Sequence, residues 1–486
     1  MIVGIDIGTQ SLKAVVTAED LSVKGEASVK YEPVFPRPGW AEQNPGLWEE
    51  SLRQAVSEAL ARAGCEASEV KVLGIAGQLD GCVAVDRNGR ALAPCLIWMD
   101  RRAVGEVPSG WTDLVRSKTG ITLDAGQMAA KMRWLLRHLD DPNSLHRFHQ
   151  PVSYLVMRLT GRHVLDHAVA STSMVYSLQE CDYDPELLDA FEIDRELLPD
   201  IAPAWSVAGF ITAAGSTLSG LPEGIPVTVG TGDDYSTPLG AGLVAPGRFV
   251  SVLGTAEVVG ALDLTAKIDW SGLVETHRYF GDSFFIENPG WLSGGSVEWF
   301  VRTWRLSGVG EMNRLAESAP PGSDGVHFLP SLSGAMAPEW IEAARGCFYG
   351  LTAAHGSAHM ARAVFEGCAF AMLDVLQRLK SMDVPVESIL LLGGGARSTT
   401  WAQIRSDMSG LPLTIPSRVD TSPVGAAMLA AVAGGIQPTL ERCAELVSGE
   451  EKQIRPSMEN HILYRAAHVR QRLLFDSLRP MYDEGR

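Results

Sequence analysis

The sequence predicts an α/β protein with two large domains. A typical domain has ~100–200 residues, and this chain of 486 residues is long enough to form two domains that each bury a core. Short β-rich runs alternate with longer segments of helical apolar period, which favours an α/β architecture. One pattern, an apolar run followed by Gly-Thr and a second apolar run, occurs once in each half. We interpret it as a weak internal duplication.

The main strands and the longest helix follow from local composition. Apolar β-rich runs bounded by glycine or proline predict strands, and a 3.6-residue apolar period over many turns predicts a long buried helix. We expect a hairpin at 3–16, strands at 70–77, 226–232, 248–255 and 388–395, and the helix at 358–380. The Gly- and Pro-containing stretch 240–248 predicts a domain boundary. We therefore place the domains at residues 1–245 and 246–486.

Charge and cysteine usage narrow the function classes. The chain has 41 Lys and Arg against 58 Asp and Glu, a formal net charge of −17, and the acidic residues are scattered. This balance favours a solvated acidic surface and gives no indication of a nucleic-acid or membrane partner. Seven cysteines without CxxC spacing argue against a disulfide framework or zinc site and for a reducing compartment. Since neither a signal peptide nor a membrane span is evident, we expect a cytoplasmic protein.

The two Gly-Thr pairs, Gly8-Thr9 and Gly254-Thr255, have the chemistry of phosphate-binding turns. Glycine lets the backbone approach a ligand, and turn N–H groups with a threonine hydroxyl can surround phosphate oxygens. Each pair alone is a weak signal, because most such pairs are ordinary hairpin turns. A third glycine cluster, at 391–401, ends a strand before a helix and could bind phosphate or a nucleotide. It lacks the Gly-Lys-Ser/Thr of a Walker loop, and no GxGxxG follows the first strand, which disfavours a dinucleotide enzyme.

The motifs together resemble the FGGY carbohydrate kinases of the actin/hexokinase-like superfamily, and within them the xylulokinase-like branch. The resemblance covers nearly the whole chain. It rests on these segments, in family order: GIDIGTQSLKA, GWAEQNPGLWEE, LGIAGQLDG, IWMDRRA, GTGDDYSTPLGAG, SVLGTAEVV, GCFYGLTAAHGSAHMARAVFEG and LLGGGARSTTWAQIRSDMSGLPL. It implies two actin/hexokinase-like (ribonuclease H-like) domains with a cleft between them. The N-terminal domain would bind the sugar and carry the catalytic base, and the C-terminal domain would bind the nucleotide.

The resemblance also implies roles for individual residues, with ATP and Mg²⁺ as cofactors. Asp233 would be the general base that takes the proton of the attacking sugar hydroxyl. Asp6 would act beside the Mg²⁺ and ATP phosphates as a catalytic and metal-binding residue. The expected phosphate-turn residues are Gly8, Thr9, Ser11, Gly254 and Thr255; those along adenosine and the α-phosphate are Gly394, Gly395 and Ala396; those of the sugar pocket are Trp40, Gln78, Asp80 and Asp233.

These residue types suit phosphoryl transfer. The reaction requires in-line geometry and neutralisation of phosphate charge, so hydrogen-bond donors, Mg²⁺ and one positioned carboxylate suffice. A closing cleft would exclude water, which otherwise turns a kinase into an ATPase. The predicted function is ATP-dependent phosphorylation of a small sugar or polyol, for example a ketopentose such as xylulose or ribulose, with a second copy of the chain as a candidate homodimer partner.

Several positions depart from the family pattern. Xylulokinases commonly have Gln-Met-His where this chain has Gln78-Leu79-Asp80, so we expect a different substrate preference. The usual Gly-Thr-Ser-Gly is replaced by Gly-Thr followed by Ala256 and Glu257. The missing hydroxyl at Ala256 and the added charge of Glu257 are expected to weaken nucleotide binding. The loop 329–340 lacks the usual Glu-Arg and has Ala335 and Met336 instead.

Alternatives stay open at this stage. Asp6 and Asp80 could simply bond backbone amides, Trp40 could serve domain packing, and Lys131 and Trp134 could serve helix packing. His146 and His149 are expected at the surface rather than on a metal. Two other functions fit the fold class: a sugar-sensing pseudokinase, suggested by Ala256 and the missing Glu-Arg, and an ATP-driven scaffold of the actin or chaperone type. Sugar-stimulated ADP release would separate all three functions.

Overall fold

The computed structural model describes residues 1–483, and the chain divides into two compact units. The first unit consists of Met1–Val244, His277–Phe284 and Thr421–Ser448. The second consists of Ala245–Thr276, Phe285–Asp420 and the chain from Gly449 onward. Each unit contains a seven-stranded sheet and its own hydrophobic core, so the predicted α/β class is confirmed.

The sheet of the first unit is built around the predicted N-terminal hairpin. β1 and β2 pair antiparallel, with Ile7 opposite Leu12, and β1 pairs parallel with β5. The strand order is β13-β14-β5-β1-β2-β3, with β15 also on β5. The strands are β1 Ile2–Ile7, β2 Ser11–Thr17, β3 Val23–Lys30, β5 Val72–Gly77, β13 Val207–Phe210, β14 Pro226–Thr228 and β15 Thr231–Gly232.

The single strand predicted at 226–232 is two strands, β14 and β15. The backbone N–H groups of the intervening Val229 and Gly230 do not pair with β5 but donate to the carbonyls of Ser206 and Ala204 (3.0 and 3.1 Å). Gly230 has φ +77°, and a Cβ there would lie 2.3 Å from the Ile75 carbonyl oxygen. Glycine therefore permits a kink that an apolar pattern does not reveal, and β15 rejoins β5 just before Asp233.

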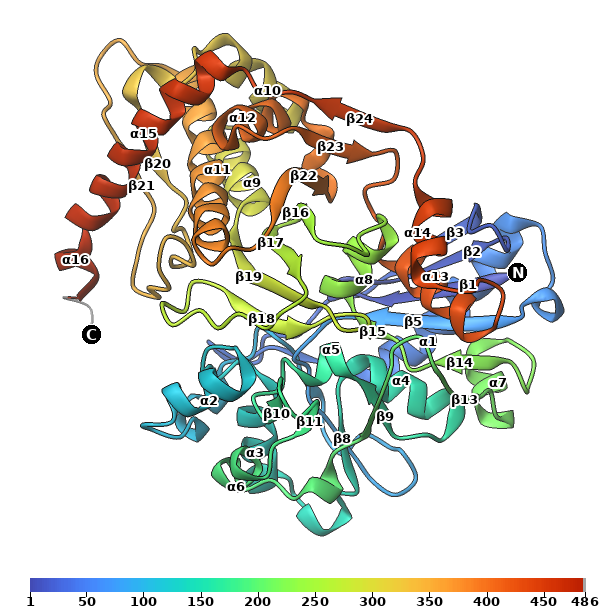
Figure 1. Cartoon of the computed structure of the whole chain (residues 1–486). Helices are drawn as coiled ribbons and strands as arrows, with labels where there is room; N and C mark the ends of the chain where they lie inside the picture. The colour runs from blue at the N-terminus through green and yellow to red at the C-terminus, as the bar shows by residue number, and fades with distance from the viewer. Residues whose placement is uncertain (484–486) are drawn as a thin grey trace. The chain divides into compact units, whose positions relative to one another are not determined.

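Helix α13 (Ser422–Ala433) comes from late in the chain and packs on β1 and β5 of the first unit. Figure 1 shows this orange-red helix beside the blue N-terminal strands. The backbones approach closely: a Cβ at Gly4 would lie 2.0 Å from the Pro423 oxygen, and one at Gly74 would lie 1.9 Å from the Ala426 oxygen. Glycine is needed at both positions because any side chain would displace the helix.

The same helix also contacts α8 (Asp233–Gly240). A Cβ at Gly425 would lie 2.0 Å from the Ser236 carbonyl oxygen. The Ser236 hydroxyl donates to the Ser422 carbonyl (2.7 Å), and the Thr421 hydroxyl donates to the Thr237 carbonyl (2.6 Å). α13 thus fixes the position of the helix that begins with Asp233.

Other helices of the first unit pack on its sheet or lie near residues of the candidate site. α1 (Pro45–Ala63) packs on β2 and β3. α3 (Met128–His138), α4 (Pro151–Thr160) and the short α5 (His167–Ala170) carry or precede the polar residues discussed below.

The second unit repeats the plan of the first. β16 and β17 form an antiparallel hairpin, and β16 pairs parallel with β22, as β1, β2 and β5 do. The long helix predicted at 358–380 is α11 (Ser357–Ser381), and it is buried all round over residues 361–376. The strands, in the order β18-β19-β17-β16-β22-β23-β24, are Glu275–Arg278, Phe284–Leu292, Ala256–Asp263, Gly247–Leu253, Val386–Leu392, Leu413–Pro416 and Glu451–Ile454.

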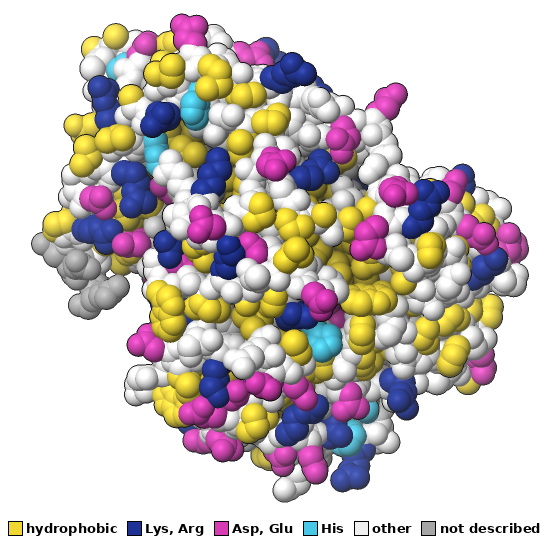
Figure 2. All heavy atoms as spheres, in the orientation of Figure 1, with side chains coloured by type: hydrophobic (Ala, Val, Ile, Leu, Met, Phe, Trp, Pro, Cys, Tyr) yellow, Lys and Arg dark blue, Asp and Glu magenta, His cyan; other side chains and the backbone are white. Residues whose placement is uncertain are grey.

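The surface agrees with the scattered charge of the sequence. In Figure 2, acidic and basic side chains are interspersed over the face shown. No helix within residues 1–483 is long and apolar enough to cross a membrane. All seven cysteines are free thiols, and Cys82, Cys95, Cys368 and Cys443 are buried.

We expect Gly74→Ala to destabilise the first unit by about 1–3 kcal/mol, the usual effect of overpacking a core. The added methyl would meet the backbone of Ala426, which cannot move without shifting α13. The matched control is Gly105→Ala, where the glycine is exposed and no atom lies within 4 Å of the new Cβ; its effect should stay below about 0.5 kcal/mol. Urea denaturation measures both. Equal midpoints for the two variants would contradict this packing.

Candidate active site

Four carboxylates gather in the first unit where β1, β5 and β15 end. Asp6 in β1 and Thr231 in β15 are both in register with Ala76 of β5, and Asp233 follows β15 as the first residue of α8. Burial and the nearby carboxylates of Asp234 and Asp6 raise the pKa of Asp233 well above its ordinary value. Burial and the Asp80 carboxylate raise the pKa of Asp234 as well. The predicted base and the predicted metal-binding residue therefore lie in one electrostatic cluster.

The donor set at Asp6 is compatible with Mg²⁺ that is bound together with phosphate. Asp6 is 3% exposed, and its Oδ2 lies 3.8 Å from Lys13 Nζ. No group of three or more metal-ligating side chains occurs within residues 1–483. Mg²⁺ commonly keeps several waters and takes one or two carboxylates plus substrate phosphates. Asp6 could thus hold Mg²⁺ only with ligands that the nucleotide and water supply.

The first Gly-Thr turn is held by side chains from several elements. The Gly8 N–H donates to the Ser11 carbonyl (2.9 Å) and closes the turn. The Tyr31 hydroxyl donates to the Gly8 carbonyl (2.7 Å), and Gln43 Nε2 donates to the Thr9 carbonyl (2.5 Å). Trp98 Nε1 donates to the Thr9 hydroxyl (3.0 Å). The turn is therefore preorganised, and sequence analysis identified none of its three supporting side chains.

Gln78 links the turn to the segment predicted to bind sugar. Its Nε2 donates to Gln43 Oε1 (2.7 Å), and its Oε1 lies 3.5 Å from the Thr9 hydroxyl. Its backbone N–H donates to the Ile7 carbonyl (2.9 Å). Because both ends of this buried amide are already in contact with protein groups, the structure gives Gln78 a bracing role, and its contact with sugar stays a prediction.

Trp40 lies in an aromatic and guanidinium stack. The Arg102 Cζ lies 3.7 Å from the centroid of the Trp40 ring, and the Trp134 ring meets Trp40 edge-on at 5.8 Å. Arg102 is held in turn by Asp100 and Glu42. These contacts support the packing role considered for Trp40 and for Trp134, while sugar contact by Trp40 stays a prediction.

Asp80 is the sugar-pocket candidate with an uncommitted side-chain atom. Its backbone is left-handed, with φ +55°, and its N–H donates to Gln150 Oε1 (2.8 Å). Its buried Oδ1 has no hydrogen-bond partner within residues 1–483. Burial raises the pKa of Asp80 to about 6, although the Lys131 charge and a hydrogen bond with Thr172 act in the opposite direction. The alternative that this carboxylate bonds backbone amides has no support in the described residues.

The second unit brings its two predicted nucleotide segments together. The Gly254-Thr255 turn connects β16 and β17. Gly393 has φ +78°, and a Cβ there would lie 2.6 Å from the Leu253 carbonyl oxygen. The following short helix, Gly394–Arg397, which contains Gly394, Gly395 and Ala396, therefore lies directly beside the turn.

A third segment at this turn was missed by sequence analysis. Helix α9 (Gly294–Thr303) begins against it: a Cβ at Gly294 would lie 2.2 Å from the Gly254 carbonyl oxygen, and the Gly295 N–H donates to the Thr255 carbonyl (3.0 Å). The only local signal was the Ser-Gly-Gly-Ser run at 293–296, which by itself is typical of an ordinary loop.

Glu257 does not add the uncompensated charge that the sequence suggested. Its carboxylate and the guanidinium of Arg405 in α12 (Thr399–Ser409) are both fully buried. They form a two-pronged ion pair of 2.5 and 2.7 Å, and the Ser251 hydroxyl also donates to Glu257 (2.8 Å). The charge is therefore neutralised inside the second unit.

The expectation that His149 lies at the surface is wrong. His149 is fully buried at the end of β8 (Arg147–His149), and its ring nitrogens lie 3.0 Å from the Ser153 hydroxyl and 2.9 Å from His163 Nδ1. His146 is half-buried and meets His163 edge-on. Burial lowers the pKa of His149 well below its usual value, so this cluster is neutral and structural.

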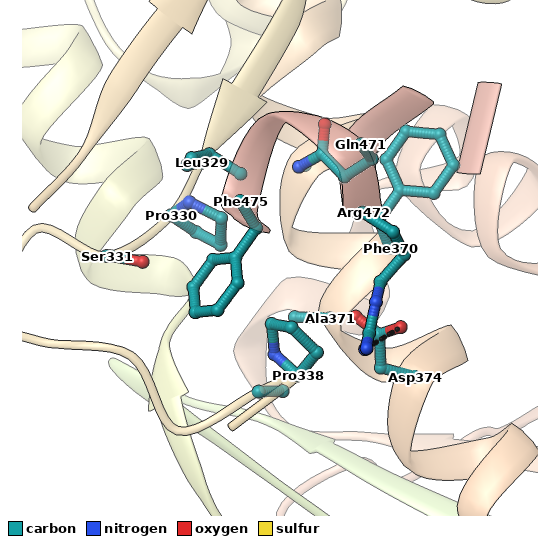
Figure 3. A pocket seen from close by; sticks show the side chains of 12 residues that line it. Leu329, Pro330, Ser331, Pro338, Phe370, Ala371, Asp374, Gln471, Arg472 and Phe475 are labelled. Carbon is teal, nitrogen blue, oxygen red and sulfur yellow. Dashed lines mark hydrogen bonds and ion pairs between the residues drawn. The ribbon is translucent and has the colours of Figure 1, made fainter. Parts of the chain in front are cut away.

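A cavity in the second unit offers no further site. It lies between α11 and α15 (Met458–Ser477) and has a volume of about 10 Å³, room for about one water molecule. Figure 3 shows Asp374 and Arg472 next to each other in its lining, and Arg472 Nη1 donates to Asp374 Oδ1 (3.3 Å). His468 also lies 2.8 Å from Asp374, so the charges in this region are already paired.

Comparison with known proteins finds matches over nearly the whole chain. Residues 1–240 match the model of the FGGY family of carbohydrate kinases, N-terminal domain, and residues 249–434 match that of the C-terminal domain. A glycerol kinase of Aromatoleum aromaticum is 31% identical over 466 residues, which cover 91% of this chain and 92% of that protein. The xylulose kinase of Escherichia coli is 29% identical over 497 residues, which cover 99% and 100%. The solved xylulose kinase of Rhodospirillum rubrum has a TM-score of 0.90 at 26% identity, over 99% of both chains.

We expect Arg405→Met to destabilise the second unit by about 3–5 kcal/mol, because it leaves the buried Glu257 carboxylate without its counter-charge. The double variant Glu257→Gln with Arg405→Met should recover most of this loss. The control is Arg248→Met, whose partner Glu451 is partly exposed; it should change stability by less than about 1 kcal/mol. Thermal and urea unfolding measure the stability of each variant against wild type. A double variant no more stable than Arg405→Met would show that the ion pair does not control this region.

Proposed function

Because the chain belongs to the FGGY family of carbohydrate kinases, whose members are phosphotransferases with an alcohol group as acceptor, we propose that it transfers the γ-phosphate of ATP to a hydroxyl of a small sugar or polyol. The family matches confirm the xylulokinase-like resemblance and the two-domain actin/hexokinase-like fold. The main support for the proposed mechanism is the position of Asp233. It lies at the start of α8, within the carboxylate cluster of Asp6, Asp80 and Asp234.

Asp233 acts as the general base in this proposal. Its neighbouring carboxylates and its burial raise its pKa, so its ionised form has a higher affinity for a proton than an exposed aspartate has. In a loose transition state the hydroxyl proton can leave late, and a carboxylate within reach is then sufficient. Mg²⁺ would neutralise charge on the phosphate oxygens, and Asp6 is the protein group proposed to hold it.

In this proposal the two domains bind different substrates. We assign sugar binding and the base to residues 1–245 and nucleotide binding to residues 246–486. Gly8, Thr9 and Ser11 of the first unit would contact the terminal phosphates, and the preorganised turn supports that role. The convergence of Gly254 and Thr255 with Gly394, Gly395 and Ala396 supports a nucleotide site in the second unit. The proposed reaction requires that both sets contact the same nucleotide.

The substrate is proposed to be a small polyol or a ketopentose such as xylulose or ribulose. Relatives named glycerol kinase and xylulose kinase both match nearly the whole chain, so the family alone does not choose between the classes. Asp80 gives a reason to prefer one kind of substrate, because an ionised carboxylate accepts hydrogen bonds and cannot donate them. The substrate should present hydroxyl donors to it. Two vicinal hydroxyls of a linear polyol or a pentulose would suit it. We therefore propose that D-xylulose is not the best substrate, with Trp40 and Gln78 beside the pocket.

Two alternative functions make different predictions in one assay. A sugar-sensing pseudokinase binds sugar without releasing ADP, and an actin- or chaperone-like scaffold releases ADP without dependence on sugar. The kinase releases ADP only with its sugar or polyol. Asp6 and Asp233 are both present, which favours catalysis, and the ion pair of Glu257 with Arg405 removes one reason for suspecting a lost nucleotide site.

We also propose a cytoplasmic enzyme of pentose metabolism, including that of xylose, without a nucleic-acid or membrane partner. The free cysteines are suited to a reducing compartment, and the net charge of −17 disfavours anionic partners. A homodimer is proposed as the assembly, and light scattering would test it.

We expect Asp233→Asn to lower kcat by about 10²–10⁴-fold, because the amide cannot accept the hydroxyl proton and has nearly the same shape. Sugar binding should persist. Coupled ADP release against a panel of pentuloses, hexuloses and polyols measures turnover, and calorimetry measures binding. Asp234→Asn is the matched control and should be much milder. Activity of Asp233→Asn within a few-fold of wild type would refute its role as the base. If Asp234→Asn instead abolishes turnover, the general base is Asp234.

We expect Asp80→His to shift specificity towards D-xylulose. A histidine can donate to a sugar oxygen where the aspartate can only accept. The change in kcat/KM should be roughly 10–100-fold, the effect of one or two hydrogen bonds to a charged group. Wild type and variant are compared on the same panel. Identical specificity profiles would mean that Asp80 does not contact the substrate.

A further inference from the structure

Lys131 in α3 is a buried lysine that the mechanism above does not use. Its side chain is fully buried. Its Nζ donates to the backbone carbonyl of Asp80 (2.7 Å) and to that of Ile97 (2.8 Å). A buried ammonium is costly unless it is hydrogen-bonded and its charge is compensated. Burial lowers the pKa of Lys131, and the Asp80 carboxylate gives the largest opposing effect.

Asp80 needs support from its surroundings to keep its conformation. A left-handed backbone at a residue other than glycine is uncommon and has an energetic cost, and Asp80 has φ +55°. Gln150 fixes its N–H and Lys131 fixes its carbonyl. Gln150 Nε2 in turn donates to the Thr172 hydroxyl (3.4 Å). Two side chains from different segments thus hold the N–H and the carbonyl of one residue.

The charges around Asp80 leave Lys131 as its main counter-charge. The charged groups that act on it are Lys131, Arg101 and Asp124, and Asp80 in turn acts on Asp234. Arg101 and Asp124 form an ion pair with each other, half-exposed at the arginine, so their effects on Asp80 largely cancel. Asp234 carries the same sign as Asp80. Only Lys131 is both buried and positive.

We propose that Lys131 is a positioning residue for sugar recognition, which holds the Asp80 turn in place through its backbone carbonyl and supplies a buried positive charge next to it. The inference rests on the proposed function of Asp80 in the sugar pocket. It replaces the helix-packing role that the sequence suggested for Lys131. Because Lys131 acts through Asp80, its removal should affect sugar binding far more than nucleotide binding or the phosphoryl-transfer step.

A double-mutant cycle with Lys131→Met and Asp80→Asn tests this coupling. On the best substrate of the panel, Lys131→Met should raise the KM for sugar roughly 10–100-fold, the scale of a lost charged hydrogen bond, with the KM for ATP unchanged and kcat within a few-fold. The double variant should be no worse than Asp80→Asn alone. A residue that only packs would instead lower stability and add its effect to that of Asp80→Asn, and this outcome would overturn the inference.

Controls separate positioning from folding and from the proposed function itself. Lys118→Met, which removes a partly exposed lysine of the same unit, should leave the sugar KM unchanged. Should Lys131→Met fail to fold, Lys131→Arg and Lys131→Gln are run in the same cycle; Lys131→Arg, which keeps the charge, should retain more sugar affinity than Lys131→Gln. Failure of all three to fold would indicate a folding role and overturn the inference. A wild type that phosphorylates no sugar or polyol refutes the proposed function instead.

Discussion

The close packing of α13 against β1, β5 and α8 is the constraint on which the candidate site depends. Backbone atoms of this helix occupy the space that side chains at Gly4 and Gly74 would fill. Asp6 lies two residues beyond Gly4 on the same strand, and Asp233 begins the helix that Gly425 contacts. Main-chain contacts deform little, so this packing sets the position of both carboxylates.

A buried carboxylate is paired with a cation in the second unit, whereas several carboxylates lie close together in the first. In the second unit, Glu257 and Arg405 neutralise each other at 2.5 and 2.7 Å, and this ion pair needs no ligand to compensate its charge. In the first unit, Asp6, Asp233 and Asp234 lie close enough to raise one another's pKa or that of a neighbour. Like charges held together in a folded protein cost stability, and such clusters are common where a cation or a substrate supplies the compensation. The excess of negative charge in this cluster therefore indicates that the catalytic groups lie in the first unit.

Local patterns in the sequence were enough to predict the two hairpins, the strand β5 and the helix α11, because each depends on residues adjacent in the chain. The family resemblance supplied the candidate roles of Asp6 and Asp233. Other features depend on contacts between distant segments and could not be predicted. The kink at Gly230 involves the Ala204 backbone, the neutralisation of Glu257 requires Arg405, and the support of Asp80 requires Lys131 and Gln150. From the sequence, Glu257 was interpreted as an added charge and Lys131 as a helix-packing residue, and their different roles became evident only from their partners in the structure.

The late position of α13 in the chain affects how the protein is made. Most of the first unit is complete once Val244 has been added, but its helix α13 lies in the segment that begins at Thr421. At about 5–20 residues per second, translation of the intervening chain takes roughly 10–35 s. During that time the surface of β1 and β5 around Gly4 and Gly74 lacks its covering helix, although the polypeptide that forms these strands already exists. The first unit therefore cannot mature on the ribosome in the order in which it is synthesised, and its folding must wait until most of the second unit has been translated.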